Sequence, residues 1–333
     1  MTLVEFHPAR RMSAMLQRMD DTSQLRLACF VLAVSVATID MVWAPLAHFQ
    51  VDYGNYLKLV LLSLTLFAGS MFYRSKRPDP RLSAMLFGAG FLCLFSAAAS
   101  MLNYCLLTVA GSRIDDVLAA IDRSLGFNWP AGMVFIAQHP VLNSALYVSY
   151  FSMLPQMALL LCILGRQESY VRIYRYCIAT AVGALICIAT WSVAPSFGAI
   201  SVYPMPVEAA HMRLALDQNY AQMLIALLAN GPGFISPIDV KGLIGFPSYH
   251  AVLALLVIYY TWSMKLLRWP AILLNAAVLA ATPFQGGHHL IDVLAGFPVA
   301  AIALLAAGEA RNLRLKSGVT ESGLAVRCAA TEL

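Results

Sequence analysis

The stretch "GFPSYHAVLALLVIYY", residues 245–260, places a proline, a serine and a histidine at the start of a long apolar run. Pro247 and Ser248 favour the start of a helix, and the apolar residues after them are typical of a membrane helix. The free N–H groups of a helix N-terminus bind anions. The stretch therefore predicts a membrane helix whose first turn presents His250 to an anion such as a phosphate group.

The composition of the whole chain indicates an integral membrane protein. Of its 333 residues, 60% are hydrophobic and only 12% are charged, and the mean hydropathy is +0.72. These values exclude an ordinary soluble protein. The length leaves room for several spans of roughly 20 residues and little for a separate soluble domain. We therefore expect one all-α, polytopic helical bundle.

Apolar runs long enough to cross about 30 Å of hydrocarbon predict about eight spans. They lie near residues 25–47, 56–73, 82–110, 141–165, 173–195, 248–264, 270–284 and 289–308. The predicted domains are a basic cytoplasmic lead-in, a transmembrane domain that holds the candidate site, and a disordered cytoplasmic tail. Their bounds are residues 1–24, 25–310 and 311–333.

The distribution of Lys and Arg predicts how the bundle is oriented. Cationic flanks stay on the cytoplasmic side of a membrane. With the N-terminus inside, most of the 22 cationic residues fall in inner segments. Both termini are therefore expected in the cytoplasm, and His250 at the outer, extracytoplasmic face. We expect an integral protein of the plasma membrane, of the bacterial inner-membrane kind.

A second histidine motif occurs in "QGGHHLIDVLAG", residues 285–296. His288 and Asp292 are four residues apart and share one face of a helix. The carboxylate can accept the Nδ1 proton, which leaves Nε2 free to attack a substrate. Gly286 and Gly287 remove side chains where the backbone has to pass close to a ligand. Alternatively, His288 and His289 mark the membrane interface, and Asp292 interacts with the helix dipole.

The two histidine motifs are predicted to lie at the same membrane face. After His250 the chain crosses the membrane, turns at "KLLRWP", residues 265–270, and returns to His288. His250 is then placed to donate a proton to a leaving oxygen. Two histidines at one face favour a catalytic site over two unrelated interfacial residues.

These motifs resemble those of the type 2 phosphatidic acid phosphatase superfamily, which carries P-S-G-H and then S-R followed by H-x-x-x-D. Here they read P-S-Y-H, residues 247–250, and "ATPFQGGHHLID", residues 281–292. A looser similarity, in residues 121–140, is to the inositol-phosphorylceramide-synthase-like branch. The resemblance implies a six-helix core and metal-independent catalysis, with core motifs in residues 240–300.

The resemblance also implies roles for three residues and no cofactor. His288 would be the nucleophile that forms a phosphohistidine, Asp292 its orienting carboxylate, and His250 the general acid. No metal is expected, because the sequence contains no paired carboxylates and no Cys/His cluster with ligand spacing.

The sequence departs from the family pattern at the positions that bind phosphate. Tyr249 replaces the glycine, Ala281 and Thr282 replace Ser-Arg, and no K-x6-R-P signature precedes them. A site with few cations suits a phosphodiester, which carries one negative charge, better than a monoester, which carries up to two. We expect the substrate to be bound by three residues of the motifs and by cations that fold back from outer segments. These residues are Ser248, Tyr249, Gly287, Lys241, Arg213 and Arg123.

Three functions remain open on the sequence alone. The first is transfer of a phosphoryl or phospho-head-group from a lipid to a lipid alcohol, as the resemblance to inositol phosphorylceramide synthase implies. The second is hydrolysis of a lipid phosphate or an isoprenyl diphosphate. The third is a transporter or structural membrane protein, although a transporter should show symmetry between its halves. The expected partners are the membrane, a phospholipid or lipid phosphate and an alcohol acceptor, and no nucleic acid.

Overall fold

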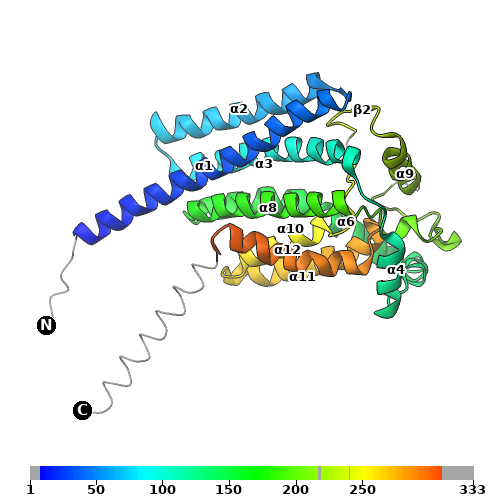
Figure 1. Cartoon of the computed structure of the whole chain (residues 1–333). Helices are drawn as coiled ribbons and strands as arrows, with labels where there is room; N and C mark the ends of the chain where they lie inside the picture. The colour runs from blue at the N-terminus through cyan, green and yellow to red at the C-terminus, as the bar shows by residue number, and fades with distance from the viewer. Residues whose placement is uncertain (1–7, 217–218, 240, 310–333) are drawn as a thin grey trace, which may run out of the picture.

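The computed structural model describes residues 8–216, 219–239 and 241–309, and these form a helical bundle (Figure 1). The α-helices are α1 (Pro8–Leu46), α2 (Tyr53–Ser75), α3 (Pro80–Cys105), α4 (Asp115–Ser124), α5 (Trp129–Ala137), α6 (Pro140–Phe151), α7 (Met153–Arg166), α8 (Tyr170–Val193), α9 (Tyr220–Asn230), α10 (Tyr249–Thr261), α11 (Lys265–Gln285) and α12 (Leu290–Ala306). Short 3-10 turns are η1 (Leu106–Val109), η2 (Ala199–Ser201) and η3 (Val207–Ala209), and two strands are β1 (Gln50–Val51) and β2 (Phe234–Ile235). The predicted tail, residues 311–333, lies outside the described residues.

The prediction of about eight spans is confirmed for five or six of them. Within the described residues, α1, α2, α3, α8 and α11 are long and apolar enough to cross a membrane, and α6 with α7 adds a sixth if that pair, bent by 50°, is one span. The other two predicted spans are α10 and α12, with 13 and 17 residues. At about 1.5 Å per residue, 13 residues reach only about 20 Å. Both are therefore shorter than the hydropathy pattern predicted.

Polar residues determine where several helices begin. Asp79 precedes Pro80, and its carboxylate accepts the backbone N–H groups of Arg81 and Leu82 at the start of α3. Asp52 accepts the N–H of Asn55 in the same way at the start of α2. Such side chains satisfy N–H groups that have no partner inside the helix. The hydropathy pattern placed both starts two or three residues late because it ignores these caps.

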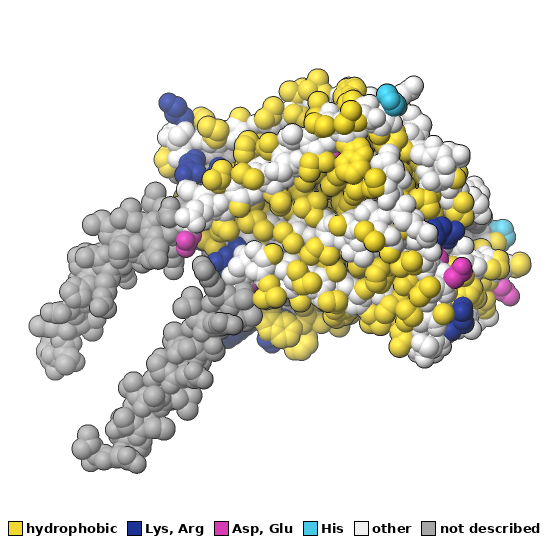
Figure 2. Space-filling model, viewed as in Figure 1, with side chains coloured by type: hydrophobic (Ala, Val, Ile, Leu, Met, Phe, Trp, Pro, Cys, Tyr) yellow, Lys and Arg dark blue, Asp and Glu magenta, His cyan; other side chains and the backbone are white. Residues whose placement is uncertain are grey.

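One apolar core holds the bundle together. It contains buried side chains from α1, α3, α7, α8, α10, α11 and α12, with Phe91, Leu164 and Tyr260 among the most deeply buried. By contrast, α2 is packed against α3 and leaves large apolar side chains such as Leu57 and Met71 more than half exposed. Figure 2 shows hydrophobic side chains across the middle of the visible face. A surface of this kind is suited to contact with lipid tails.

The short elements gather at one end of the bundle. α1 begins and α12 ends at the left in Figure 1, whereas α4, α9 and β2 lie at the right. β1 and β2 form a parallel pair in which Gln50 lies opposite Phe234. This pair ties the α1–α2 connection to the segment between α9 and α10. The N-termini of α10 and α12 also face this end, so both histidine motifs lie there.

Candidate active site

His250 and His288 line one small pocket at this end of the bundle. The pocket has a volume of about 160 Å³ and is lined by Tyr150, Phe197, Gly198, Leu216, Tyr220, Gly242, Leu243, Ile244, Gly245, His250, Gly286 and His288. His250 comes from the first turn of α10, and His288 comes from the connection between α11 and α12. The structure thus brings together the two histidines that the sequence placed at one face.

His288 is held by Asp292, as the four-residue spacing predicted. The Nδ1 atom of His288 is 3.1 Å from Oδ2 of Asp292, and the carboxylate is fully buried. The same oxygen accepts the backbone N–H of His289 at 2.9 Å. With Nδ1 engaged in this way, Nε2 is the nitrogen left to act on a ligand.

Gly286 and Gly287 have different structural roles. A Cβ on Gly286 would lie 2.8 Å from both the hydroxyl oxygen of Tyr150 and Cδ2 of His288, so a side chain would intrude on the pocket. Gly287 has a φ of +64°, and a Cβ there would lie 2.8 Å from Ile200. Gly287 is therefore required by backbone conformation and packing, and of the two glycines expected to allow a close approach, only Gly286 borders the pocket residues Tyr150 and His288.

His289 lies between two carboxylates of α4. Its side chain is fully buried, with Nε2 at 3.6 Å from Asp115 and Nδ1 at 3.4 Å from Asp122. Burial disfavours the charged ring, but the two carboxylates outweigh it and raise the pKa of His289 to about 9. The two flanking carboxylates therefore favour the protonated form of His289. This corrects the alternative that His289 is an interfacial residue facing the membrane surface.

Asp122 connects α4 to the start of α12. Its two carboxylate oxygens accept the backbone N–H groups of Leu290 and Ile291, each at 2.9 Å. These are N–H groups of the first turn of α12, which lack partners inside the helix. A negative charge at a helix N-terminus is also favoured by the helix dipole. Asp122 therefore fixes the helix that carries Asp292.

Asp115 anchors the loop that forms another wall of the pocket. Its Oδ1 accepts the backbone N–H groups of Phe197 and Gly198 and the hydroxyl of Ser196. Arg113 forms an ion pair with its Oδ2 at 2.8 Å. Although burial alone would raise the pKa of Asp115, these donors and the nearby His289 keep it below its usual value.

Tyr150 is the nearest aromatic neighbour of His250. The two rings are stacked, with centroids 4.3 Å apart and an interplanar angle of 16°. The Tyr150 hydroxyl oxygen is 3.4 Å from Nδ1 of His250. Sequence reasoning did not select Tyr150, Asp115 or Asp122. The only signal for Asp122 was the looser similarity of residues 121–140, and no signal in the sequence pointed to Asp115 or Tyr150.

The remaining predicted binding residues do not line the pocket. Ser248 caps α10 through a hydrogen bond from the N–H of Ala251, and its own N–H donates to the carbonyl of Asp292. The hydroxyl of Tyr249 donates to the carbonyl of Thr180 on α8.

The three predicted cations are exposed. The Arg213 guanidinium lies over the ring of Tyr147, and Arg123 donates to the hydroxyl of Tyr203. The backbone N–H of Lys241 donates to the hydroxyl of Tyr104. Their role in binding substrate stays a prediction.

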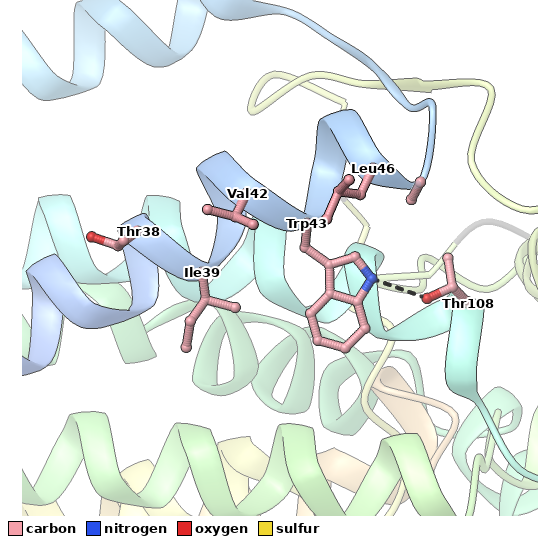
Figure 3. Close-up of a pocket in the computed structure, with 7 residues that line it drawn as sticks. Thr38, Ile39, Val42, Trp43, Leu46 and Thr108 are labelled. Atoms are coloured by element: carbon pink, nitrogen blue, oxygen red, sulfur yellow. Dashed lines mark hydrogen bonds between the residues drawn. The ribbon is translucent and has the colours of Figure 1, made fainter.

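A larger groove lies on a different part of the surface. It has a volume of about 600 Å³ and is formed mainly by the C-terminal end of α1. Trp43 donates a hydrogen bond to Thr108 across it (Figure 3). Its lining contains no His, Asp or Glu, so it offers none of the groups that the chemistry of the histidine motifs requires.

Comparison with known proteins identifies one family. A family model described as the PAP2 superfamily matches residues 116–306, more than half of the chain. The match runs from α4 through the end of α12, so it contains both histidine motifs and Asp122. No curated protein and no solved structure matches the chain.

Proposed function

Because the chain belongs to the PAP2 superfamily, whose members are generally membrane phosphatases or phosphotransferases that act on phosphate esters, we propose that it transfers a phospho-head-group from a phospholipid to an alcohol acceptor. This proposal follows the inositol-phosphorylceramide-synthase-like branch. The intermediate is a phosphohistidine on His288. The nucleophile, acid and orienting roles belong to His288, His250 and Asp292.

The observation that carries the proposal is the charge of the pocket. Its twelve described lining residues include two histidines and two tyrosines but no Lys or Arg. A phosphate monoester carries up to two negative charges near neutral pH and a diester carries one. Burying the second charge without a fixed cation would be costly. The pocket is therefore better matched to a phosphodiester, which is the head-group linkage of a phospholipid.

The chemistry proceeds in two steps with balanced proton transfers. In the first step, Nε2 of His288 attacks phosphorus, the bond to the lipid alcohol oxygen breaks, and His250 gives that oxygen a proton. In the second step, an acceptor hydroxyl attacks the phosphohistidine and its proton passes to His250. The N–P bond breaks and His288 is restored. Asp292 holds Nδ1 and stabilises the charged ring in both steps.

The proposed location of the chemistry is the extracytoplasmic face of a plasma membrane. Two observations support this location. The sequence places the cationic segments at the other side, and α4 and α9 gather at one end of the bundle (Figure 1), the end at which His250 and His288 line the pocket. A reporter placed within residues 200–240 should be accessible from outside intact cells. Labelling only after permeabilisation would place the pocket at the inner face.

The function is tested by product analysis with purified protein in mixed micelles. A panel of phospholipids and lipid phosphates is supplied with and without a long-chain alcohol, and products are identified by mass. The proposal predicts that diacylglycerol and a phospho-head-group ester of the alcohol form in equal amounts. Release of inorganic phosphate from lipid phosphates or isoprenyl diphosphates, with no transfer product, would instead identify a hydrolase.

A further inference from the structure

Tyr150 occupies a position between the two histidines of the pocket. It lies in the last turn of α6, beside the 50° bend that separates α6 from α7. Its ring stacks on His250, and its hydroxyl oxygen is 3.4 Å from Nδ1 of His250. A Cβ added at Gly286 would lie 2.8 Å from both the Tyr150 hydroxyl oxygen and Cδ2 of His288, so these two groups face the same small space. Tyr150 therefore contacts the proposed acid and faces the proposed nucleophile.

A general acid must carry its proton on the nitrogen that faces the leaving group. In histidine, the contact made by the other nitrogen determines which nitrogen that is. For His288 this contact is Asp292. For His250 the hydrogen-bond contact of Nδ1 is the Tyr150 hydroxyl, which leaves Nε2 for the leaving oxygen.

The stacked ring is one contribution in favour of a protonated His250, and it acts against the effects of burial and of the neighbouring His288. The face of a tyrosine ring attracts a cation placed over it, and an imidazolium at 4.3 Å is in range of this attraction. The hydroxyl oxygen of Tyr150 also lies 3.4 Å from Nδ1 of His250, where it can donate or accept according to the tautomer.

We propose that Tyr150 is a positioning residue for His250: its ring stabilises the imidazolium and its hydroxyl binds Nδ1, so that Nε2–H points at the leaving oxygen. The inference rests on the proposed function, because it assigns a partner to the general acid of that reaction. The ring and the hydroxyl of Tyr150 make these two contributions. Tyr150→Phe removes only the hydroxyl and Tyr150→Leu removes both, so the two variants separate them.

The first experiment compares two phosphodiesters that share a head group. One has an alkyl alcohol as leaving group and needs protonation, and the other has nitrophenol and does not. Tyr150→Leu removes ring and hydroxyl, so turnover of the alkyl diester should fall about 100-fold, while turnover of the nitrophenyl diester falls less than about threefold. Tyr150→Phe keeps the ring and should lose about tenfold on the alkyl diester only.

The pH dependence of kcat/KM gives a readout that a packing role would not change. The basic limb reports loss of the proton from the acid. In Tyr150→Leu this limb should move about one pH unit lower because the stacked ring no longer favours the imidazolium. In Tyr150→Phe the limb should stay close to its wild-type position, because the ring remains.

A matched control removes a buried hydroxyl elsewhere. Tyr176, on α8, is not among the residues that line the pocket, so Tyr176→Phe should behave as wild type with both substrates. Activity on the nitrophenyl diester shows that each variant is folded. Equal losses on both substrates, with an unchanged basic limb, would overturn the role of Tyr150.

Failure of this inference can be distinguished from failure of the proposed function. If His288→Ala abolishes turnover of both diesters and His250→Ala is rescued by nitrophenol, the proposed roles of the histidines hold. Tyr150 variants without leaving-group dependence would then refute only the positioning role. If His288→Ala retains activity on either diester, the proposed function itself fails.

Discussion

Replacing His289 with glutamine removes the positive charge between Asp115 and Asp122, and we expect it to destabilise the fold in a pH-dependent way. The wild-type imidazole lies at 3.6 and 3.4 Å from the two carboxylates. Each carboxylate keeps its other donors in the variant. For Asp115 these are the backbone N–H groups of residues 197–198, and for Asp122 they are those of residues 290–291. The variant therefore mainly loses the charge of His289.

The size of the effect follows from the pKa of His289. Folding raises this pKa from 6.5 to about 9, and one pKa unit corresponds to about 1.4 kcal/mol. The charged ring thus contributes about 3 kcal/mol to stability. A raised pKa gives stability that is complete below pH 6.5 and is lost as the pH rises to 9. The lowered pKa of Asp115 acts only below the usual Asp range, so it does not oppose this trend.

The assay is unfolding of the purified protein in detergent micelles, followed by circular dichroism, between pH 6 and pH 9.5. Wild-type stability should fall across this range, whereas His289→Gln should be about 3 kcal/mol less stable at pH 6 and nearly independent of pH. His139→Gln changes an exposed imidazole and should keep the wild-type slope. A wild-type curve that is flat from pH 6.5 to 9, or an equal slope in His289→Gln, would refute the reasoning.

Three further predictions concern the same site. Asp122→Ala leaves two N–H groups of α12 without partners at about 1–3 kcal/mol each, so it should lower the free energy of unfolding by about 2–6 kcal/mol in the same assay. Asp122→Asn, which keeps one acceptor, should lose less, and an equal loss would argue against the capping role. Asp292→Asn should lower kcat of the transfer reaction by about 10⁴-fold, as for other orienting carboxylates, and a change confined to KM would contradict its assignment. Turnover should survive dialysis against a chelator, and a loss restored by added magnesium would show that the histidine mechanism is incomplete.

The membrane bundle could be predicted from hydropathy because apolar runs are a local signal. The same signal overestimated α10 and α12, since apolar residues continue beyond the points where these helices end. It also missed the bend after Phe151, where α6 and α7 meet within one apolar run. The ends and bends of helices depend on caps and tertiary contacts, which hydropathy does not contain.

The pairing of His288 with Asp292 could be predicted from their four-residue spacing. The expectation that both lie on one face of a helix was wrong for His288, because α12 begins at Leu290. The contacts of His289 could not be predicted, because Asp115 and Asp122 lie more than 160 residues away in the sequence and are brought close only when α4 folds against α12. Tyr150 could not be selected from the sequence for a related reason. A tyrosine in an apolar run is ordinarily a core residue, and only the bundle places it on His250.

The central claim, that His288 forms a covalent phosphohistidine, is tested most directly by trapping that intermediate. Purified protein is mixed with a phospholipid labelled with ³²P in the head-group phosphate, without an alcohol acceptor, and quenched in alkali, in which phosphohistidine is stable. The account predicts that label is bound to the peptide containing His288, is released on addition of alcohol, and is absent from His288→Gln. Label retained by His288→Gln, or transfer by wild-type protein with no labelled peptide at any time, would contradict it.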